Sequence, residues 1–176
     1  MGNGYQLRRI TGGYIALFQG TPLLMQLFVI YYGLGLIGLT LPAWAAVAIA
    51  FTLHASAFLG EIWRGSIEAL PKGQFEAAKA LGLHYVPRMR DVILPQALRI
   101  ALPATIGFLV QLIKGTSLAA IVGFIELARA GQIVSNQTYE PLLVFSVVGA
   151  IYFALCWPLS LYGMRVESRI ASTTAR

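Results

Sequence analysis

The chain has 176 residues, of which 57% are hydrophobic and only 11% charged, and its formal net charge is +6. An ordinary globular domain is about 25% charged. No charged residue lies between Arg9 and Glu61, although a helical membrane span needs only about 20 apolar residues. The sequence therefore predicts an integral membrane protein and excludes a disordered chain, a collagen-like repeat and a secreted disulfide scaffold.

The positive charge does not by itself indicate nucleic-acid binding, which needs Lys and Arg clustered on one soluble face. Cytoplasmic loops of membrane proteins collect the same residues, so we expect no nucleic-acid partner. The single cysteine, Cys156, lies inside an apolar run and is expected to be a packing residue. The two histidines, His54 and His84, have no suitably spaced partners, so no metal site is expected.

Four apolar segments are predicted to span the membrane, and charges, glycines and prolines set their ends. They cover residues 15–39, 42–60, 100–125 and 141–164. Lys114 and Gly115 interrupt the third segment, so we expect the helix to be broken there. The sequence thus predicts an all-α, polytopic membrane protein.

The distribution of basic residues predicts how the chain is oriented. Segments 1–14, 61–99 and 165–176 hold two, six and three of the thirteen Lys and Arg residues, and they all lie on one side of the four spans. By the positive-inside rule that side is cytoplasmic. We therefore expect both termini inside the cell and a large cytoplasmic loop at 61–99.

Short helices are expected within the loop 61–99. The prolines and glycines predict one helix over 74–81, stopped by Gly82, and another that starts at Pro87 and ends before Pro95. Such helices could lie in the lipid interface, or they could dock into a groove on a soluble partner. The residues alone leave both alternatives open.

Residues 76–82 form the run Glu-Ala-Ala-Lys-Ala-Leu-Gly, and nine residues later residues 92–95 form Val-Ile-Leu-Pro. This pattern resembles the EAA loop of ABC-importer permeases, with Val92 in place of an isoleucine. The flanking motifs resemble those of one subgroup, the polar amino-acid permeases of the histidine, glutamine and arginine uptake type. These motifs are Gly20-Thr21-Pro22-Leu23, Glu61-Ile62-Trp63-Arg64-Gly65, Pro71-Lys72-Gly73-Gln74, Leu94-Pro95-Gln96-Ala97-Leu98-Arg99, Lys114 with Thr116-Ser117-Leu118, and Glu126-Leu127 with Gly131-Gln132.

The resemblance implies the transmembrane domain of a type I ABC importer (MetI-like), a single domain over residues 1–170 followed by a cytoplasmic tail at 171–176. In such importers the EAA loop forms a coupling helix that docks into a cleft of the cytoplasmic ATPase. Carried over to this chain, Glu76 would make the polar contact at the cleft. Ala77, Ala78 and Leu81 would pack within it, and Gly82 would permit the sharp turn.

The same resemblance implies partners and a place in the cell. We expect two ATP-binding cassette subunits, a second permease copy or paralogue, an extracytoplasmic substrate-binding protein and a polar amino acid as substrate. The chain has no Gly-rich phosphate loop, so ATP and Mg²⁺ would be bound by the ATPase and no cofactor by this chain. The expected location is the bacterial inner membrane, which the chain crosses several times.

Polar residues within the spans are candidates for the translocation pathway. Lys114 is the strongest candidate, because an ionisable group at membrane depth is energetically costly and is usually functional or paired. Alternatively, the lysine extends its ammonium group to the membrane surface or donates to backbone carbonyls at a helix break. Thr116 and Ser117 follow the break and could line the pathway. His54 is either a packing and hydrogen-bonding residue or a member of the pathway.

The chain departs from the family pattern at several positions. His54-Ala55 replaces a frequent Asn-Ser, and Gly115 replaces an aspartate after the lysine, so the sequence leaves open which amino acid is carried. The family also has one more helix ahead of Gly20, and we expect this chain to be a member that lacks it. Two other functions are weighed against transport: a structural membrane subunit, and an intramembrane enzyme whose loop offers only the scattered Glu76, His84 and Asp91.

Overall fold

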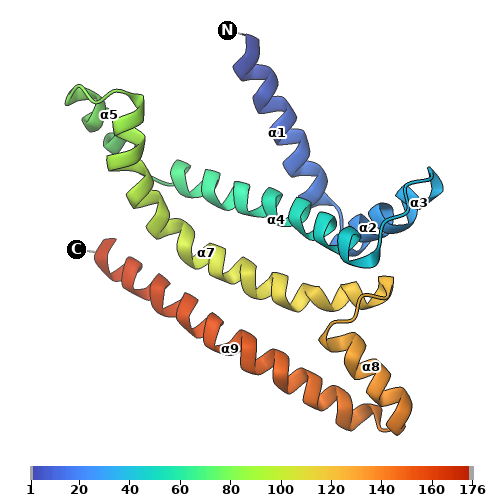
Figure 1. Ribbon diagram of the computed structural model, residues 1–176. Helices are drawn as coiled ribbons and strands as arrows, with labels where there is room; N and C mark the ends of the chain where they lie inside the picture. The colour runs from blue at the N-terminus through green and yellow to red at the C-terminus, as the bar shows by residue number, and fades with distance from the viewer. Residues whose placement is uncertain (1, 175–176) are drawn as a thin grey trace. The chain divides into compact units, whose positions relative to one another are not determined.

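A computed structural model describes the backbone of residues 2–174 and the side chains of residues 6–170 (Figure 1). Every regular element in this range is helical, which confirms the all-α prediction. In chain order the elements are α1 (Gly2–Gly20), α2 (Leu23–Phe28), the π-turn η1 (Val29–Gly33), α3 (Leu34–Leu36), α4 (Ala43–Glu68), α5 (Lys72–Ala80), α6 (Tyr85–Pro87), the π-turn η2 (Arg88–Ile93), α7 (Leu94–Gly115), the 3₁₀ segment η3 (Thr116–Val122), α8 (Leu127–Thr138) and α9 (Pro141–Thr174).

The chain divides into two compact units. Unit 1 contains Met1–Phe58 and Val110–Trp157, and unit 2 contains Leu59–Leu109 and Pro158–Arg176. The boundaries fall within α4, α7 and α9, so each of these helices contributes residues to both units.

Within the described residues, three helical stretches are long and apolar enough to cross a membrane: Ala43–Glu68, Tyr85–Val122 and Pro141–Ile170. A fourth candidate is the pair Gln6–Gly20 and Leu23–Leu36, which is bent by 104°. The first span predicted from sequence, residues 15–39, is therefore not one straight helix. Pro22 causes the difference, because it lacks an amide hydrogen and holds an extended conformation at the start of α2 (φ −63°, ψ 138°).

The predicted short helix between Pro87 and Pro95 is wrong, since the helix that starts at Tyr85 continues through Pro95 to Val122. Just before the proline, residues Arg88–Ile93 form a π-turn, in which backbone hydrogen bonds join residues five apart instead of four. In addition, the Gln96 side-chain amide donates to the Val92 carbonyl at 2.8 Å. A proline is tolerated inside a helix when such adjustments satisfy the freed backbone groups.

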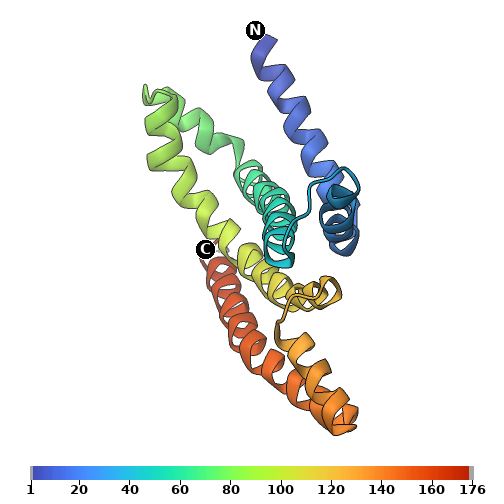
Figure 2. The ribbon, with the colours of Figure 1, turned by 45° about the vertical axis from the view of Figure 1, so that its right-hand side comes forward.

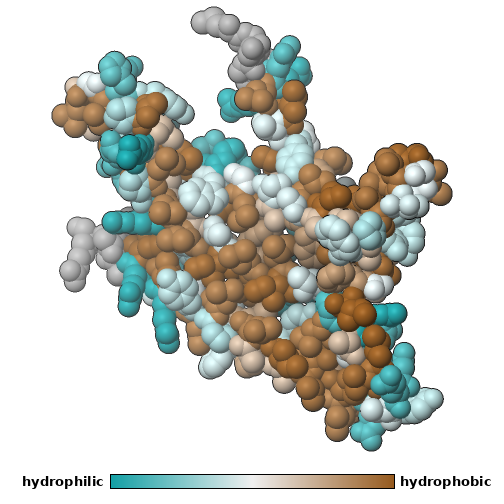
Figure 3. Space-filling view, viewed as in Figure 1, coloured by the Kyte–Doolittle hydropathy of each residue, from teal (hydrophilic) through white to brown (hydrophobic). Residues whose placement is uncertain are grey.

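Large apolar side chains remain exposed along the spans. They include Leu142 of α9, whose relative exposure is 84%, and Figure 3 shows apolar side chains over most of the visible face. A water-soluble monomer rarely exposes contiguous apolar patches of more than a few hundred Å². The long apolar helices and this surface identify a multi-pass membrane protein.

Glycine permits a close approach of α8 to α9 in unit 1, where the two helices lie side by side (Figures 1 and 2). A Cβ atom placed at Gly131 would lie 2.6 Å from the Val148 Cγ2 atom, which is closer than packed carbons approach. Small residues at helix contacts are typical of membrane proteins, where packing rather than water exclusion holds helices together.

Replacing Gly131 with alanine should therefore push α8 away from α9. We expect a loss of about 1–3 kcal/mol in stability, the usual cost of overpacking, measured as a lower thermal unfolding midpoint in detergent. Gly149→Ala is the matched control, because a Cβ there meets nothing within 4 Å. Val148→Ala should restore the stability of Gly131→Ala. Equal midpoints for Gly131→Ala and Gly149→Ala would contradict the close contact.

Candidate functional site

The helix α5 carries the Glu-Ala-Ala run, and backbone hydrogen bonds set its end. The Gly82 amide donates to the Lys79 carbonyl at 3.0 Å, and the Leu83 amide donates to the Ala78 carbonyl at 3.2 Å. These two bonds form a Schellman motif, which needs a left-handed residue after the helix. Gly82 supplies it with φ +76°. The helix stop thus depends on a glycine, as the sequence suggested.

The residues predicted to contact an ATPase do not all face the same way. Glu76, Ala77 and Leu81 are exposed, and Leu81 has a relative exposure of 80%. Gly82 is exposed as well. Ala78, in contrast, is only 3% exposed, so it packs against its own chain instead of offering an outward contact. Four of the five predicted residues therefore form a free surface, which we call the α5 outer face.

The inward side of α5 holds this surface in place. Phe75 packs on a buried cluster of Leu70, Ile93 and Ala97 in unit 2. A second link is polar: the Gln96 side-chain amide nitrogen donates to the Gln74 side-chain oxygen Oε1 at 3.1 Å. The two residues lie 22 positions apart, and the sequence gives no signal for this pairing beyond two glutamines in flanking motifs.

Charge pairing fixes the end of α4 just before α5. The Arg64 Nε atom donates to Glu61 at 2.8 Å, and an Arg64 terminal nitrogen lies 2.6 Å from a Glu68 carboxylate oxygen. These residues are one helical turn apart, so the pairs stabilise helical geometry where α4 enters the loop region. The pairs are solvent-exposed, and each contributes little to stability by itself.

The helix break after Lys114 forms the second candidate site. The α-helix α7 ends at Gly115, and the chain continues as the 3₁₀ segment η3. The Thr116 hydroxyl donates to the Ile113 carbonyl at 2.7 Å, and the Ser117 hydroxyl donates to the Lys114 carbonyl at 2.8 Å. The two hydroxyls thus satisfy carbonyls at the break, while the Lys114 side chain is exposed in the last turn of α7.

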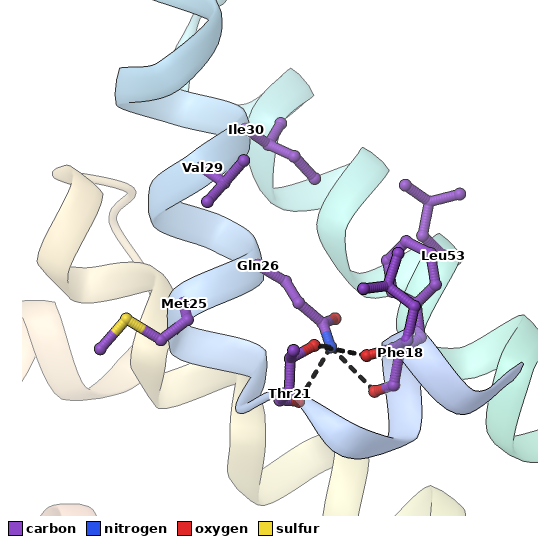
Figure 4. A pocket seen from close by; sticks show the side chains of 8 residues that line it. Phe18, Thr21, Met25, Gln26, Val29, Ile30 and Leu53 are labelled. Atoms are coloured by element: carbon purple, nitrogen blue, oxygen red, sulfur yellow. Dashed lines mark hydrogen bonds between the residues drawn. The ribbon is translucent and has the colours of Figure 1, made fainter. Parts of the chain in front are cut away.

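His54 of α4 belongs to a buried polar cluster with Gln26, whose hydrogen bonds at the bend between α1 and α2 are drawn in Figure 4. The Gln26 amide nitrogen donates to the Phe18 carbonyl at 2.9 Å and lies 3.0 Å and 2.9 Å from the backbone and side-chain oxygens of Thr21. The His54 Nδ1 atom lies 3.2 Å from the Gln26 amide oxygen. Both side chains have a relative exposure of 8%. This geometry favours the hydrogen-bonding interpretation of His54.

A cavity of about 240 Å³ lies next to this cluster. Figure 4 shows the Gln26 amide at its polar end, with apolar side chains around the rest. The lining residues are Leu17, Phe18, Thr21, Met25, Gln26, Val29, Ile30 and Leu53.

The bend and the helix break share one core in unit 1. Leu27 of α2, Ala50 of α4 and Val122 of η3 form a buried apolar cluster. A Cβ atom at Gly115 would lie 3.6 Å from a Leu23 methyl carbon, so the start of α2 contacts the end of α7. The structure thus brings the Lys114–Ser117 stretch close to the α1–α2 bend, although these segments are about 90 residues apart in sequence.

Comparisons with known proteins place the chain among transport proteins. The sequence model of the family described as "Binding-protein-dependent transport system inner membrane component" matches residues 1–172. The probable amino-acid ABC transporter permease protein YckA of Bacillus subtilis is 37% identical over 158 residues, which are 90% of this chain and 70% of that protein. The L-cystine transport system permease protein TcyB of the same species is 37% identical over 97% of this chain and 73% of its own length.

Solved structures show the same fold. A crystal structure of an amino acid ABC transporter with histidines superimposes with a TM-score of 0.88 at 34% identity, covering 96% of this chain and 79% of that chain. An inward-facing structure of the MetNI methionine ABC transporter gives a TM-score of 0.74 at 23% identity, over 95% and 77% of the two chains. The second likeness concerns the fold alone.

The hydrogen bonds of Gln26 predict that it stabilises the α1–α2 bend. Gln26→Leu should lower the thermal unfolding midpoint, because buried acceptors left unpaired cost about 1–3 kcal/mol. Gln111→Leu is the matched control, since Gln111 is an exposed glutamine of α7. If both variants unfold at the same temperature as the unsubstituted protein, the hydrogen bonds of Gln26 contribute nothing to the stability of the bend.

Proposed function

Because the chain belongs to the family of binding-protein-dependent transport system inner membrane components, we propose that it is the permease subunit of an ATP-driven ABC importer for polar amino acids. Support comes from its relatives, among them a probable amino-acid permease and an L-cystine permease, and from the 34% identical amino acid ABC transporter structure. The observation that carries the proposal is the α5 outer face, a helix surface that the described residues of unit 2 leave exposed.

In the proposed mechanism the α5 outer face docks onto a cytoplasmic ATPase. Glu76 supplies a carboxylate for a polar contact, and Leu81 supplies an apolar side chain that is 80% exposed in this chain. Ala77 is small, so the partner can approach the helix backbone closely. Ala78 makes no contact with the ATPase in this mechanism, because its methyl group is buried within unit 2.

Coupling requires that force on α5 reach the spans. The Schellman motif at Gly82 fixes one end of α5, and Phe75 and the Gln74–Gln96 hydrogen bond attach it to the π-turn and the start of α7. From there α7 continues to Gly115, and the 3₁₀ segment η3 follows it to Val122. Closure of two ATPase subunits would thus act on a helix that carries Lys114 near its far end.

The translocation pathway is proposed to run past the helix break at residues 114–117. Lys114 is an exposed cation in an apolar span, and it can attract the carboxylate of an amino acid. Thr116 and Ser117 shape the pathway by holding the broken backbone, since their hydroxyls bond to its carbonyls. His54 contributes through Gln26, at the bend that contacts the same region.

The proposed assembly contains two ATP-binding cassette subunits, a second permease copy or paralogue and an extracytoplasmic substrate-binding protein. ATP and Mg²⁺ are bound by the ATPase subunits and not by this chain. The proposed location is the inner membrane of a bacterial cell. By the positive-inside rule, the positions of the basic residues favour an orientation with both termini and α5 on the cytoplasmic side.

Glu76→Ala should reduce the stimulation of a partner ATPase about ten-fold, which corresponds to the loss of one hydrogen bond to a charged group. Gly82→Ala should also weaken coupling, because alanine at φ +76° is strained by about 1–2 kcal/mol and displaces the end of α5. The measurement is co-purification with candidate ATPases and the rate of ATP hydrolysis in proteoliposomes.

The matched control is Glu167→Ala, which removes an exposed carboxylate from α9, outside the loop region. It should leave complex formation and ATP hydrolysis unchanged. If the complex and its stimulated hydrolysis survive both Glu76→Ala and Gly82→Ala undiminished, α5 is not the coupling helix.

Lys114→Ala should lower amino-acid uptake and alter selectivity among amino acids, while the complex still assembles and hydrolyses ATP. Lys114→Arg keeps the cation and should retain more uptake than alanine. Uptake assays with anionic, neutral and cationic amino acids measure the effect, and Arg165→Ala, an exposed cation of α9, is the control. Unchanged uptake and selectivity in Lys114→Ala would remove this residue from the pathway.

A further inference from the structure

The segment between α7 and α8 is not α-helical, and both of its ends lie near the side chain of Tyr152. It starts at Gly115, passes through the 3₁₀ turns of η3, turns at Gly123 with φ +80° and reaches Glu126 in extended geometry. Irregular backbone at membrane depth is tolerated only where it is buried in protein or lines a water-filled cavity. Some interaction must therefore hold this segment in place.

Glu126 forms the C-terminal end of that segment. Its carboxylate oxygens accept the Ala128 amide at 2.8 Å and the Arg129 amide at 2.7 Å, which caps the start of α8. The Tyr152 hydroxyl of α9 donates to the same carboxylate at 3.0 Å. One carboxylate thus satisfies two free amides of α8 and joins them to a residue 26 positions later.

Tyr152 also lies near the beginning of the segment, since its hydroxyl is close to the Thr116 side chain. The Tyr152 phenol of α9 therefore lies near the first residue of η3 and is hydrogen-bonded to the N-cap residue of α8. The close contact of Gly131 with Val148 holds α8 on α9 little more than one helical turn away, so Tyr152 acts from a fixed support.

The choice of glutamate at this cap points to a role beyond capping. Asp, Asn, Ser and Thr are the preferred N-cap residues, because a short side chain reaches the helix amides without strain. The longer glutamate reaches the amides and the Tyr152 hydroxyl together. A cap alone would not need that reach.

We propose that Glu126 and Tyr152 are positioning residues that hold segment 115–126, and with it Thr116 and the neighbouring Lys114, in the arrangement required for transport. The proposal rests on the proposed function of the chain as a permease. Neither residue needs to touch the substrate. Their bond sets where the broken helix lies relative to α9 in unit 1.

The experiment compares Tyr152→Phe with Glu126→Asp in the full transporter complex in proteoliposomes. Phenylalanine keeps the ring and removes the donor. Aspartate is a good N-cap, but it withdraws the carboxylate by about 1.5 Å, one carbon–carbon bond, from Tyr152. Both variants should lower the number of amino acids imported per ATP hydrolysed about ten-fold, while ATP hydrolysis and complex assembly persist.

Two controls separate positioning from general destabilisation. Tyr162→Phe removes an exposed hydroxyl from the same helix and should change nothing. The double variant Tyr152→Phe with Glu126→Asp should be no worse than either single variant, because both remove the same bond. Additive losses would show that the two residues act independently and would overturn the proposal.

Amide hydrogen exchange of the purified chain in nanodiscs tests the bond without any transport measurement. Exchange over residues 116–126 should rise in Tyr152→Phe and in Glu126→Asp but not in Tyr162→Phe. Unchanged exchange in the first two variants would overturn the proposal, as would faster exchange with normal import per ATP. A wild-type complex that imports no amino acid would instead overturn the proposed function, and the exchange comparison would still decide whether the bond holds the segment.

Discussion

In a bilayer, each backbone amide and carbonyl must find its partner within the protein, and this requirement shapes the irregular features of the predicted spans. The bend at Thr21 is closed by the Gln26 amide, which bonds to carbonyls freed by Pro22. The break after Gly115 is closed by two hydroxyls. The helix passes Pro95 through a π-turn and a bond from Gln96 to a backbone carbonyl. Side chains thus bond to backbone carbonyls in all three places, the first two in the predicted spans and the third in the loop region.

These replacements also connect elements that are distant in sequence. The Gln26 side chain contacts His54 of α4, and Gln96 is hydrogen-bonded to Gln74 of α5. Thr116 lies near Tyr152 of α9. A polar group that closes a helix break in an apolar environment has donors or acceptors left over, and they are satisfied by the neighbouring helix. The irregular points of the helices are therefore also the points where helices are joined, which makes them suitable places to transmit movement.

The sequence predicts features that depend on neighbouring residues and misses those that depend on packing. Apolar length predicts the membrane spans, and the glycine at position 82 predicts where α5 stops, because its left-handed turn needs no distant partner. The break at Gly115 is marked by its own residues. The continuation through Pro95 could not be predicted, because the π-turn before the proline and the bond from Gln96 to the Val92 carbonyl have no signal in the neighbouring residues. Ala78 is buried while its neighbour Ala77 is exposed, and no local pattern distinguishes the two alanines.

The division of α5 into an inner and an outer side has an evolutionary consequence. Phe75 and Ala78 serve folding, and the Schellman turn is formed by the backbone, so neither depends on the identity of Glu76 or Leu81. Surface residues that carry no folding role can be exchanged at little cost in stability. A permease built this way can be adapted to a diverged or a shared ATPase by changing a few outward side chains, and its membrane domain keeps the same structure.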